Sequence, residues 1–163
     1  MDERELAARR ALTVALRTAA AILGSREEAA DVAQDVAIDV LRSLHKLREP
    51  AAFDAWVHRM TVRRTLRALR KRRAGDVPFA LALELPADTP DHDQVLATRA
   101  VLAHAMKTLP PRQRVALALR YVHDLDDEQI AAALGCRVGT VHALLSRARA
   151  TLRDEPRLQE LTR

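Results

Sequence analysis

Apolar residues recur at helical spacing through most of this chain, and this recurrence limits the fold to packed helices. Residues three and four positions apart share one face of an α-helix, so a stripe of them predicts an amphipathic helix. The first part of the chain has three such stripes: Leu12, Leu16, Ala19 and Leu23; Val32, Val36, Val40 and Leu44; and Phe53, Trp56, Val57 and Met60. The third follows the turn "LREP", and Pro50 suits a first helical turn.

The remainder of the chain reads as helices too. Breaks at Pro110-Pro111, at "HDLD" and at Gly135 separate four further helical segments, over 94–107, 111–123, 127–134 and 138–153. Only four glycines and 2% aromatic residues, with few β-branched ones, also disfavour sheets. The predicted fold class is therefore all-α, and 48% hydrophobic residues can supply its cores.

The segment "AGDVPFALALELPADTPDHD", residues 74–93, divides these helices into two groups. It holds three prolines and no sustained helical period, as is typical of a linker. It also holds five acids and no Lys or Arg, whereas Arg59–Arg73 holds eight basic residues and no acid. We therefore predict two small helical domains, a three-helix unit over 1–73 and a four-helix unit over 94–163, joined by an acidic linker over 74–93.

The third predicted helix carries a cationic stripe. Arg59, Arg63, Arg67 and Arg70 fall within about 80° of one another around the helix axis. Like charges at this spacing repel, and a phosphate backbone neutralises them with release of counterions. The net charge of +5 agrees with a nucleic-acid partner. The alternative is a solvated face whose salt-bridge partners lie elsewhere in the fold.

The second predicted helix has an acidic face opposite its valines. Asp31, Gln34 and Asp35 lie on this face with Ile38, and Arg42 follows. An exposed acidic patch often serves solubility alone. Beside a basic, DNA-binding face it suits a protein partner better than DNA.

The run "DDEQIAAALGCRVGTVHALL" predicts a helix-turn-helix. Asp126 can cap its first helix, and Gln129 three residues later completes a capping box. Ala131 is small where two helices cross, Gly135 can take a positive φ in the turn, and Val141 anchors the second helix. A helical hairpin without a role in DNA binding is the alternative.

The second helix of this motif has an unusual outward face. With Val141, Leu145, Ala148 and Leu152 turned inward, we expect the opposite side to show Thr140, Ala143, Leu144, Arg147 and Thr151. A face that reads bases is usually more polar. Its predicted DNA contacts are Arg137, Thr140, Arg147 and Arg149.

Catalytic and metal-binding patterns do not emerge from the sequence. Cys136 is the only cysteine, which excludes an internal disulfide and a Cys-based zinc site. The six histidines follow no metal-ligand spacing, and no glycine-rich phosphate loop occurs. We expect no catalytic residue, metal or cofactor. A charged N-terminus and the lack of an apolar run near ~18 residues lead us to expect a cytoplasmic protein.

Three segments together resemble the sigma-70 family of bacterial RNA polymerase sigma factors, and specifically its extracytoplasmic-function group. "ILGSREEAADVAQDVAIDVLRSL" resembles the part of region 2 that meets core polymerase, and "FDAWVHRMTVRRTLRALRKRR" the part that melts and reads the minus-ten element. "LPPRQRVALALRYVHDLDDEQIAAALGCRVGTVHALLSRARATL" resembles region 4, which reads the minus-thirty-five element. The resemblance covers about three quarters of the chain, in family order.

This resemblance implies a transcription initiation factor. Asp31, Gln34 and Asp35 match positions that dock on the clamp helices of the largest polymerase subunit. Residues 46–53 match a loop that helps to hold a flipped base, and the region of Arg63 and Arg64 lies against the unwound strand. Region 4 would dock on the flap of the second-largest subunit and place its recognition helix on promoter DNA. The acidic linker would run toward the RNA exit path, and an anti-sigma factor is a further partner of many relatives.

The chain departs from the family pattern at several positions. Arg63 stands where Asn is frequent, and Arg67 where Asp is common. His142, Ala143 and Leu144 replace a frequent Lys-Ser-Arg run. Arg137 replaces a common Ser cap, at a cost of about 1 kcal/mol to the helix. We therefore expect the recognition helix to depend on the other unit and on polymerase for promoter selection.

Two other classes remain as alternatives. A stand-alone helix-turn-helix regulator with an N-terminal dimerisation unit would bind paired half-sites without polymerase. An enzyme is the more distant alternative, because the histidines and glycines lack the spacing of known catalytic motifs.

Overall fold

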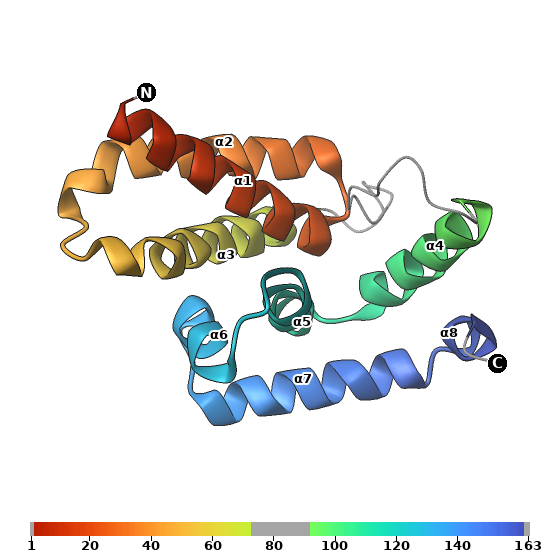
Figure 1. Ribbon diagram of the computed structural model, residues 1–163. Helices are drawn as coiled ribbons and strands as arrows, with labels where there is room; N and C mark the ends of the chain where they lie inside the picture. Colours follow the sequence, from red (N-terminus) through yellow and green to blue (C-terminus); the bar gives the residue numbers. More distant parts are fainter. Residues whose placement is uncertain (1, 73–91, 162–163) are drawn as a thin grey trace.

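The computed structural model describes residues 2–72 and 92–161, and every regular element in these ranges is helical, as predicted (Figure 1). The elements in chain order are α1 (Glu3–Leu23), α2 (Arg26–Ser43), the 3-10 turns η1 (Leu44–Lys46) and η2 (Pro50–Ala52), α3 (Phe53–Lys71), α4 (His92–Thr108), α5 (Pro111–His123), α6 (Asp127–Leu134), α7 (Val138–Arg153) and α8 (Pro156–Leu161). Among the described helices, none combines the length and apolar character that crossing a membrane requires.

Helices α1, α2 and α3 form the first unit, and α1 packs most extensively against α2. On α1 the expected inward stripe was partly wrong. Leu12 and Leu16 are exposed, at 39% and 36%, whereas Ala11 and Ala15 are completely buried. Small side chains allow two helices to approach closely, so the alanine face of α1 is the one that meets α2.

The other two stripes of this unit agree with expectation. Val32, Val36 and Val40 of α2 are buried, as are Phe53 and Val57 of α3. Gly24 ends α1 with a φ of 62°, a left-handed conformation that glycine adopts without steric cost. The next residue, Ser25, caps α2 by accepting a hydrogen bond from the backbone N–H of Glu28.

The second unit confirms the predicted helix-turn-helix. Asp126 and Gln129 form a complete capping box at the start of α6. Gly135 ends α6 with a φ of 64°, and Val141, Leu145 and Ala148 of α7 are buried. Arg137 begins α7 without a side-chain cap, as expected from its sequence. The short helix α8 was not predicted.

The two units also share a hydrophobic core. Ile22 of α1 and Val62 of α3 join a cluster that includes Val115, Ile130 and Val141. Helix α5 packs against α1, and α6 packs against α3 (Figure 1). The sequence did not predict that the two units pack against each other.

Arg114 reinforces this contact from within. It is 7% exposed, and it donates hydrogen bonds to the carbonyls of Ile22 in α1, Lys107 in α4 and Leu109. Burial lowers the pKa of Arg114, and the nearby charge of Arg72 lowers it further. Carbonyl acceptors at the ends of α1 and α4 compensate this buried cation.

The predicted linker over 74–93 lies mostly outside the described residues, which resume at His92. Helix α4 begins there, two residues before the predicted start at 94. The division into domains over 1–73 and 94–163 therefore stays a prediction.

Candidate nucleic-acid interface and the neighbouring acidic face

The cationic stripe lies on the exposed side of α3. Arg59, Arg63, Arg67 and Arg70 are all exposed there, while Thr61, Val62 and Thr65 between them are buried. Within residues 2–72 and 92–161, the ion pairs involve none of these four arginines. Among the described residues, no carboxylate neutralises these four charges, as a nucleic-acid strand would.

Arg64 is placed differently from the stripe. Its guanidinium turns toward α2, where it donates to Asp39 from Nε at 2.8 Å and to Asp35 from Nη1 at 3.0 Å. The Arg64 side chain is 32% exposed. The structure thus puts one residue of the predicted DNA-binding set in contact with one residue of the predicted protein-binding set.

The acidic face of α2 has the exposure that its prediction requires. Asp31, Gln34 and Asp35 are exposed, and Ile38 beside them is 44% exposed. Of the two aspartates, Asp35 is the one with a described ion pair, to Arg64. A groove between α2 and α3, lined mainly by charged residues, brings Asp31 and Asp35 close to Arg67 and Lys71. The acidic and basic surfaces are therefore direct neighbours.

The segment between α2 and α3 is compact and polar on its outside. The 3-10 turns η1 and η2 occupy much of residues 44–52, and His45, Lys46, Arg48 and Glu49 are exposed. Leu44 and Leu47 pack inward against the core of the first unit. The two leucines thus anchor the segment to the core, while its charged side chains face solvent.

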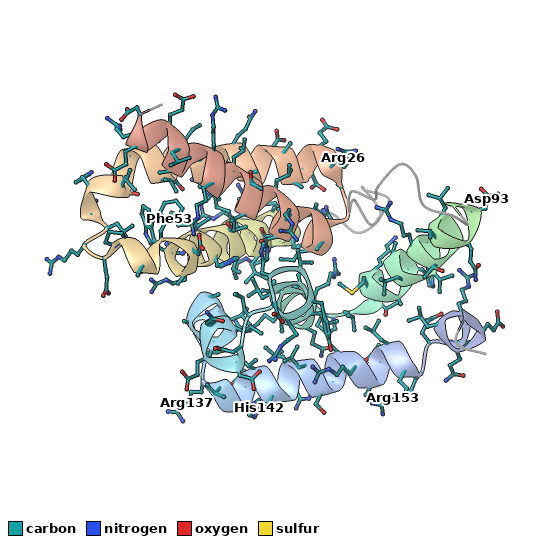
Figure 2. All side chains as sticks on the ribbon, in the orientation of Figure 1. Arg26, Phe53, Asp93, Arg137, His142 and Arg153 are labelled. Carbon is teal, nitrogen blue, oxygen red and sulfur yellow. The ribbon has the colours of Figure 1, made fainter. Side chains whose placement is uncertain are left out.

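The recognition helix α7 presents the predicted DNA contacts at its surface. Arg137, Thr140, Arg147 and Arg149 are all exposed, and Figure 2 labels Arg137, His142 and Arg153 along the helix. Leu144 was misplaced in the expected outward face, because it packs partly against the core. Around the helix axis it lies about 60° from Val141 and about 60° from Arg147, at the edge between the inward and outward faces.

Arg149 is held by an aromatic neighbour. Its guanidinium carbon lies 5.9 Å from the centre of the Tyr121 ring, and its Nε donates to the Tyr121 hydroxyl at 3.1 Å. Tyr121 lies in the last turn of α5 with 66% of its surface exposed. The ring and its hydroxyl therefore restrict the freedom of the Arg149 side chain.

Asp127 joins three helices of the second unit, and sequence reasoning missed it. Its two carboxylate oxygens accept from Arg120 of α5 and approach Nε2 of His142 in α7 at 2.6 Å. The three residues belong to three different helices, so only the fold brings them together. They fix the orientation of α7 against α5 and α6.

The described residues contain no group of three or more His, Cys, Asp or Glu that could hold a metal ion. Cys136 lies half-buried in the turn between α6 and α7.

Comparisons with known proteins agree with this arrangement. A family model described as "Sigma-70 region 2" matches residues 7–75, and one described as "Sigma-70, region 4" matches residues 99–152. The RNA polymerase sigma-E factor of Streptomyces coelicolor is 31% identical over 140 residues, which cover 86% of this chain and 78% of that protein. The ECF RNA polymerase sigma factor SigE of Mycolicibacterium smegmatis is 33% identical over 145 residues, and these cover 85% of this chain but 55% of SigE.

Two solved structures share the fold. CnrH, in complex with the cytosolic domain of CnrY, matches with a TM-score of 0.62 and 23% identity over 93% of this chain and 96% of CnrH. The sigma factor RpoE of Bartonella quintana, in complex with the anti-sigma factor NepR, matches with a TM-score of 0.66 and 22% identity over 98% and 94%. The two family models and the sigma-E relatives show that this chain belongs to the extracytoplasmic-function group of the sigma-70 family, the transcription initiation factors that direct RNA polymerase.

Proposed function

We propose that this chain binds core RNA polymerase through the exposed face of α2 and contacts promoter DNA through α3 and α7. The observation that carries the proposal is the side-by-side placement of an exposed acidic face on α2 and, on α3, a cationic stripe without an ion-pair partner among the described residues. A protein partner with basic residues would take the first surface, and a nucleic-acid strand would take the second. The chain would act without catalytic residues or a cofactor, in the cytoplasm where polymerase and chromosome are found.

For polymerase, we propose that Asp31, Gln34 and Asp35 dock on the clamp helices of the largest subunit. Asp31 is the cleanest contact, because it has no described internal partner, whereas Asp35 would have to share its charge with Arg64. The second unit would dock on the flap of the second-largest subunit. A bound anti-sigma factor, as in the structure of RpoE with NepR, would compete for surfaces of this kind.

For DNA, we propose that Arg59, Arg63, Arg67 and Arg70 lie against the minus-ten element as it opens. Residues 46–53 would help to hold a base that has left the stack. Helix α7 would lie in the major groove at the minus-thirty-five element with Arg137, Thr140, Arg147 and Arg149. One bidentate arginine discriminates between bases by about 1–3 kcal/mol, and a specific complex needs about 4–10 kcal/mol. Selectivity would therefore depend on both units bound to one polymerase.

Capture of core polymerase by the full-length chain tests the first part of the proposal. Asp31→Lys reverses a charge on the exposed side of α2, so we expect a folded protein that no longer retains core polymerase. Glu27→Lys is the matched control, because Glu27 is also an exposed acid of α2 but lies outside the proposed contact. Equal retention by Asp31→Lys and wild type would reject docking through this face. Promoter binding at full affinity without polymerase would favour a stand-alone regulator instead.

A further inference from the structure

Two buried imidazole rings meet where the first unit contacts the second. His58 comes from α3 and His123 from the end of α5, and their ring centres are 4.6 Å apart in an edge-to-face arrangement. His58 is only 4% exposed, and its Nδ1 is buried without a hydrogen-bond partner. Neither ring has a carboxylate within hydrogen-bonding distance among the described contacts, although Asp54, one turn before His58 on α3, has a buried Oδ1 without a hydrogen-bond partner.

The hydrogen bonds of Thr18 in α1 determine which ring nitrogen of neutral His123 carries the hydrogen. The Thr18 hydroxyl donates its hydrogen to the carbonyl of Val14 at 2.8 Å. It can then only accept from Nε2 of His123, which lies 2.6 Å away. A neutral ring with its hydrogen on Nε2 satisfies this contact completely. A second proton would enter on Nδ1, close to His58.

The surroundings make that second proton unfavourable. Burial lowers the pKa of His123 to about 4, and the neighbouring His58 and Arg17 of α1 lower it too, while Asp54 raises it. Burial also lowers the pKa of His58, against the smaller opposing effect of Asp54. Asp54 is itself paired with Arg10 of α1 at 2.6 Å.

Other charged groups around the rings add little. Asp124, next to His123 in the chain, is exposed. Among the described residues, α6, which packs on α3, and α7, which packs on α5, contribute no charged group to the pKa of either ring. The chemistry of the pair is therefore set by the contact between α1, α3 and α5.

The contact between the two units has a polar part and an apolar part. Besides the rings, it contains a hydrogen bond from Nη2 of Arg17 to the carbonyl of Val122, at 3.1 Å, and the shared core around Ile22 and Val62. Thr18 and His58 lie on one side of it, and His123 on the other. Parting the units would bring water to both rings and return them to ordinary histidine behaviour.

We propose that His58 and His123 form a proton-sensitive latch, which holds the two units together while both rings are neutral and releases them when the rings take up protons. The latch concerns the conformation of the chain alone and does not depend on the proposed contacts with polymerase or DNA. Release would uncover the part of α3 that α6 covers, which includes Val62, Leu66 and Leu69.

The direction of the pH dependence follows from proton linkage. Both histidines bind protons more weakly in the joined form, so the joined form has its full stability above pH 6.5 and loses it as the pH falls toward 4. With a pKa of about 4 joined and about 6.5 parted, His123 alone favours the parted form about tenfold more at pH 5.5 than at neutral pH. His58 acts in the same direction.

Energy transfer within the chain can measure the distance between the two units. Trp56 of α3 is the only tryptophan and can serve as an energy-transfer donor in the first unit. Ser146 is exposed on α7, so Ser146→Cys in a Cys136→Ser background places an acceptor dye on the second unit. We expect transfer efficiency to fall between pH 7.5 and pH 4.5, while helix content measured by circular dichroism stays constant. An unlabelled sample at each pH corrects for changes in Trp56 emission.

Variants test whether the pH dependence of energy transfer comes from His58 and His123. His123→Phe and His58→Phe keep a flat ring but cannot take up a proton, so the double variant should show transfer that is independent of pH. His45→Phe is the control, because His45 is an exposed histidine of the same chain, and it should respond as wild type does. Unchanged transfer in wild type from pH 7.5 to 4.5, or an equal fall in the double variant, would overturn the latch. NMR titration gives a second test on the unmodified chain, where the titration midpoint of His123 should lie below 6.5, between that value and the pKa of about 4 of the joined form, and a midpoint near 6.5 would overturn the proposal.

Discussion

Arg64 of α3 donates two hydrogen bonds to one carboxylate oxygen of Asp39 in α2, from Nε at 2.8 Å and from Nη2 at 2.5 Å. The bond from Nη1 to Asp35 extends the contact one turn along α2. Charge-assisted bonds of this kind hold two helices in register as well as attracting opposite charges. The neighbouring Arg63 is exposed and has no described partner. Two consecutive arginines therefore have different roles.

Replacing either partner of this contact should weaken the fold. Both side chains are 32% exposed, so solvent screens the pair, and we expect Arg64→Gln or Asp39→Asn to lower the free energy of unfolding by about 1 kcal/mol. Urea denaturation followed by circular dichroism measures this change. Arg63→Gln is the matched control and should change stability by less than about 0.5 kcal/mol.

The same variants separate structure from DNA binding. If Arg64→Gln unfolds like wild type but fails to open promoters, Arg64 acts on the unwound strand, as the sequence comparison with the family first implied. Its position between Asp35 and Asp39 would then be a resting arrangement.

The cationic stripe predicts a salt effect on promoter opening. Replacing Arg59, Arg63, Arg67 and Arg70 by Ala removes charges that have no described internal partner. Each lost phosphate contact should reduce the slope of log affinity against log salt by about 0.7–0.9, and open-complex formation by holoenzyme should fall. Arg9→Ala is a suitable control, since Arg9 is exposed on α1 and paired with Glu5. A quadruple variant with the wild-type salt slope would mean that the stripe is merely solvated.

The sequence predicted the second unit better than the first. Helices α5, α6 and α7 begin and end at the predicted residues, and several of these boundaries have a local signal. Pro111 starts α5, the capping box of Asp126 and Gln129 starts α6, and Gly135 ends it. Signals of this kind act within a few residues and do not depend on tertiary contacts.

The features that the sequence could not predict are contacts between distant helices. Periodicity assigned Leu12 and Leu16 to the core by their size, but the close approach of α1 to α2 selects the alanines one position earlier. Arg64, Asp127 and the pair of His58 and His123 depend on helices that meet only in the fold. The exposed residues of the candidate site could therefore be predicted from the sequence, whereas the side-chain contacts between its helices could not.

The start of α7 offers a gain in stability. Arg137 occupies the N-cap with φ of −82° and ψ of 154°, a conformation that Ser adopts readily, but its side chain caps nothing. Arg137→Ser should therefore stabilise the protein by about 1 kcal/mol and raise Tm by about 2–4 °C. Calorimetry measures the shift, and Arg147→Ser in the middle of the same helix should give no increase. An unchanged Tm for Arg137→Ser would show that the free N–H groups of α7 are already satisfied by water.

Arg147 is the residue of α7 that we expect to choose between bases. It is exposed, whereas Arg149 is occupied by Tyr121 and Leu144 packs against the core. A free guanidinium in the major groove can bind guanine with two hydrogen bonds, so Arg147→Ala should lower discrimination at the upstream element by about 1–3 kcal/mol. Binding of holoenzyme to matched and mismatched promoters measures this difference.

Variants of two neighbouring residues test whether base discrimination depends on Arg147 itself. Arg149→Ala should weaken binding to both promoters about equally, because a contact to phosphate carries no sequence information. Leu144→Ala should leave discrimination unchanged and lower the free energy of unfolding by about 1–2 kcal/mol, less than for a fully buried leucine. If Leu144→Ala instead relaxes base choice and Arg147→Ala does not, the groove-facing side of α7 is the one around Leu144, and the orientation of the recognition helix on DNA must be turned accordingly.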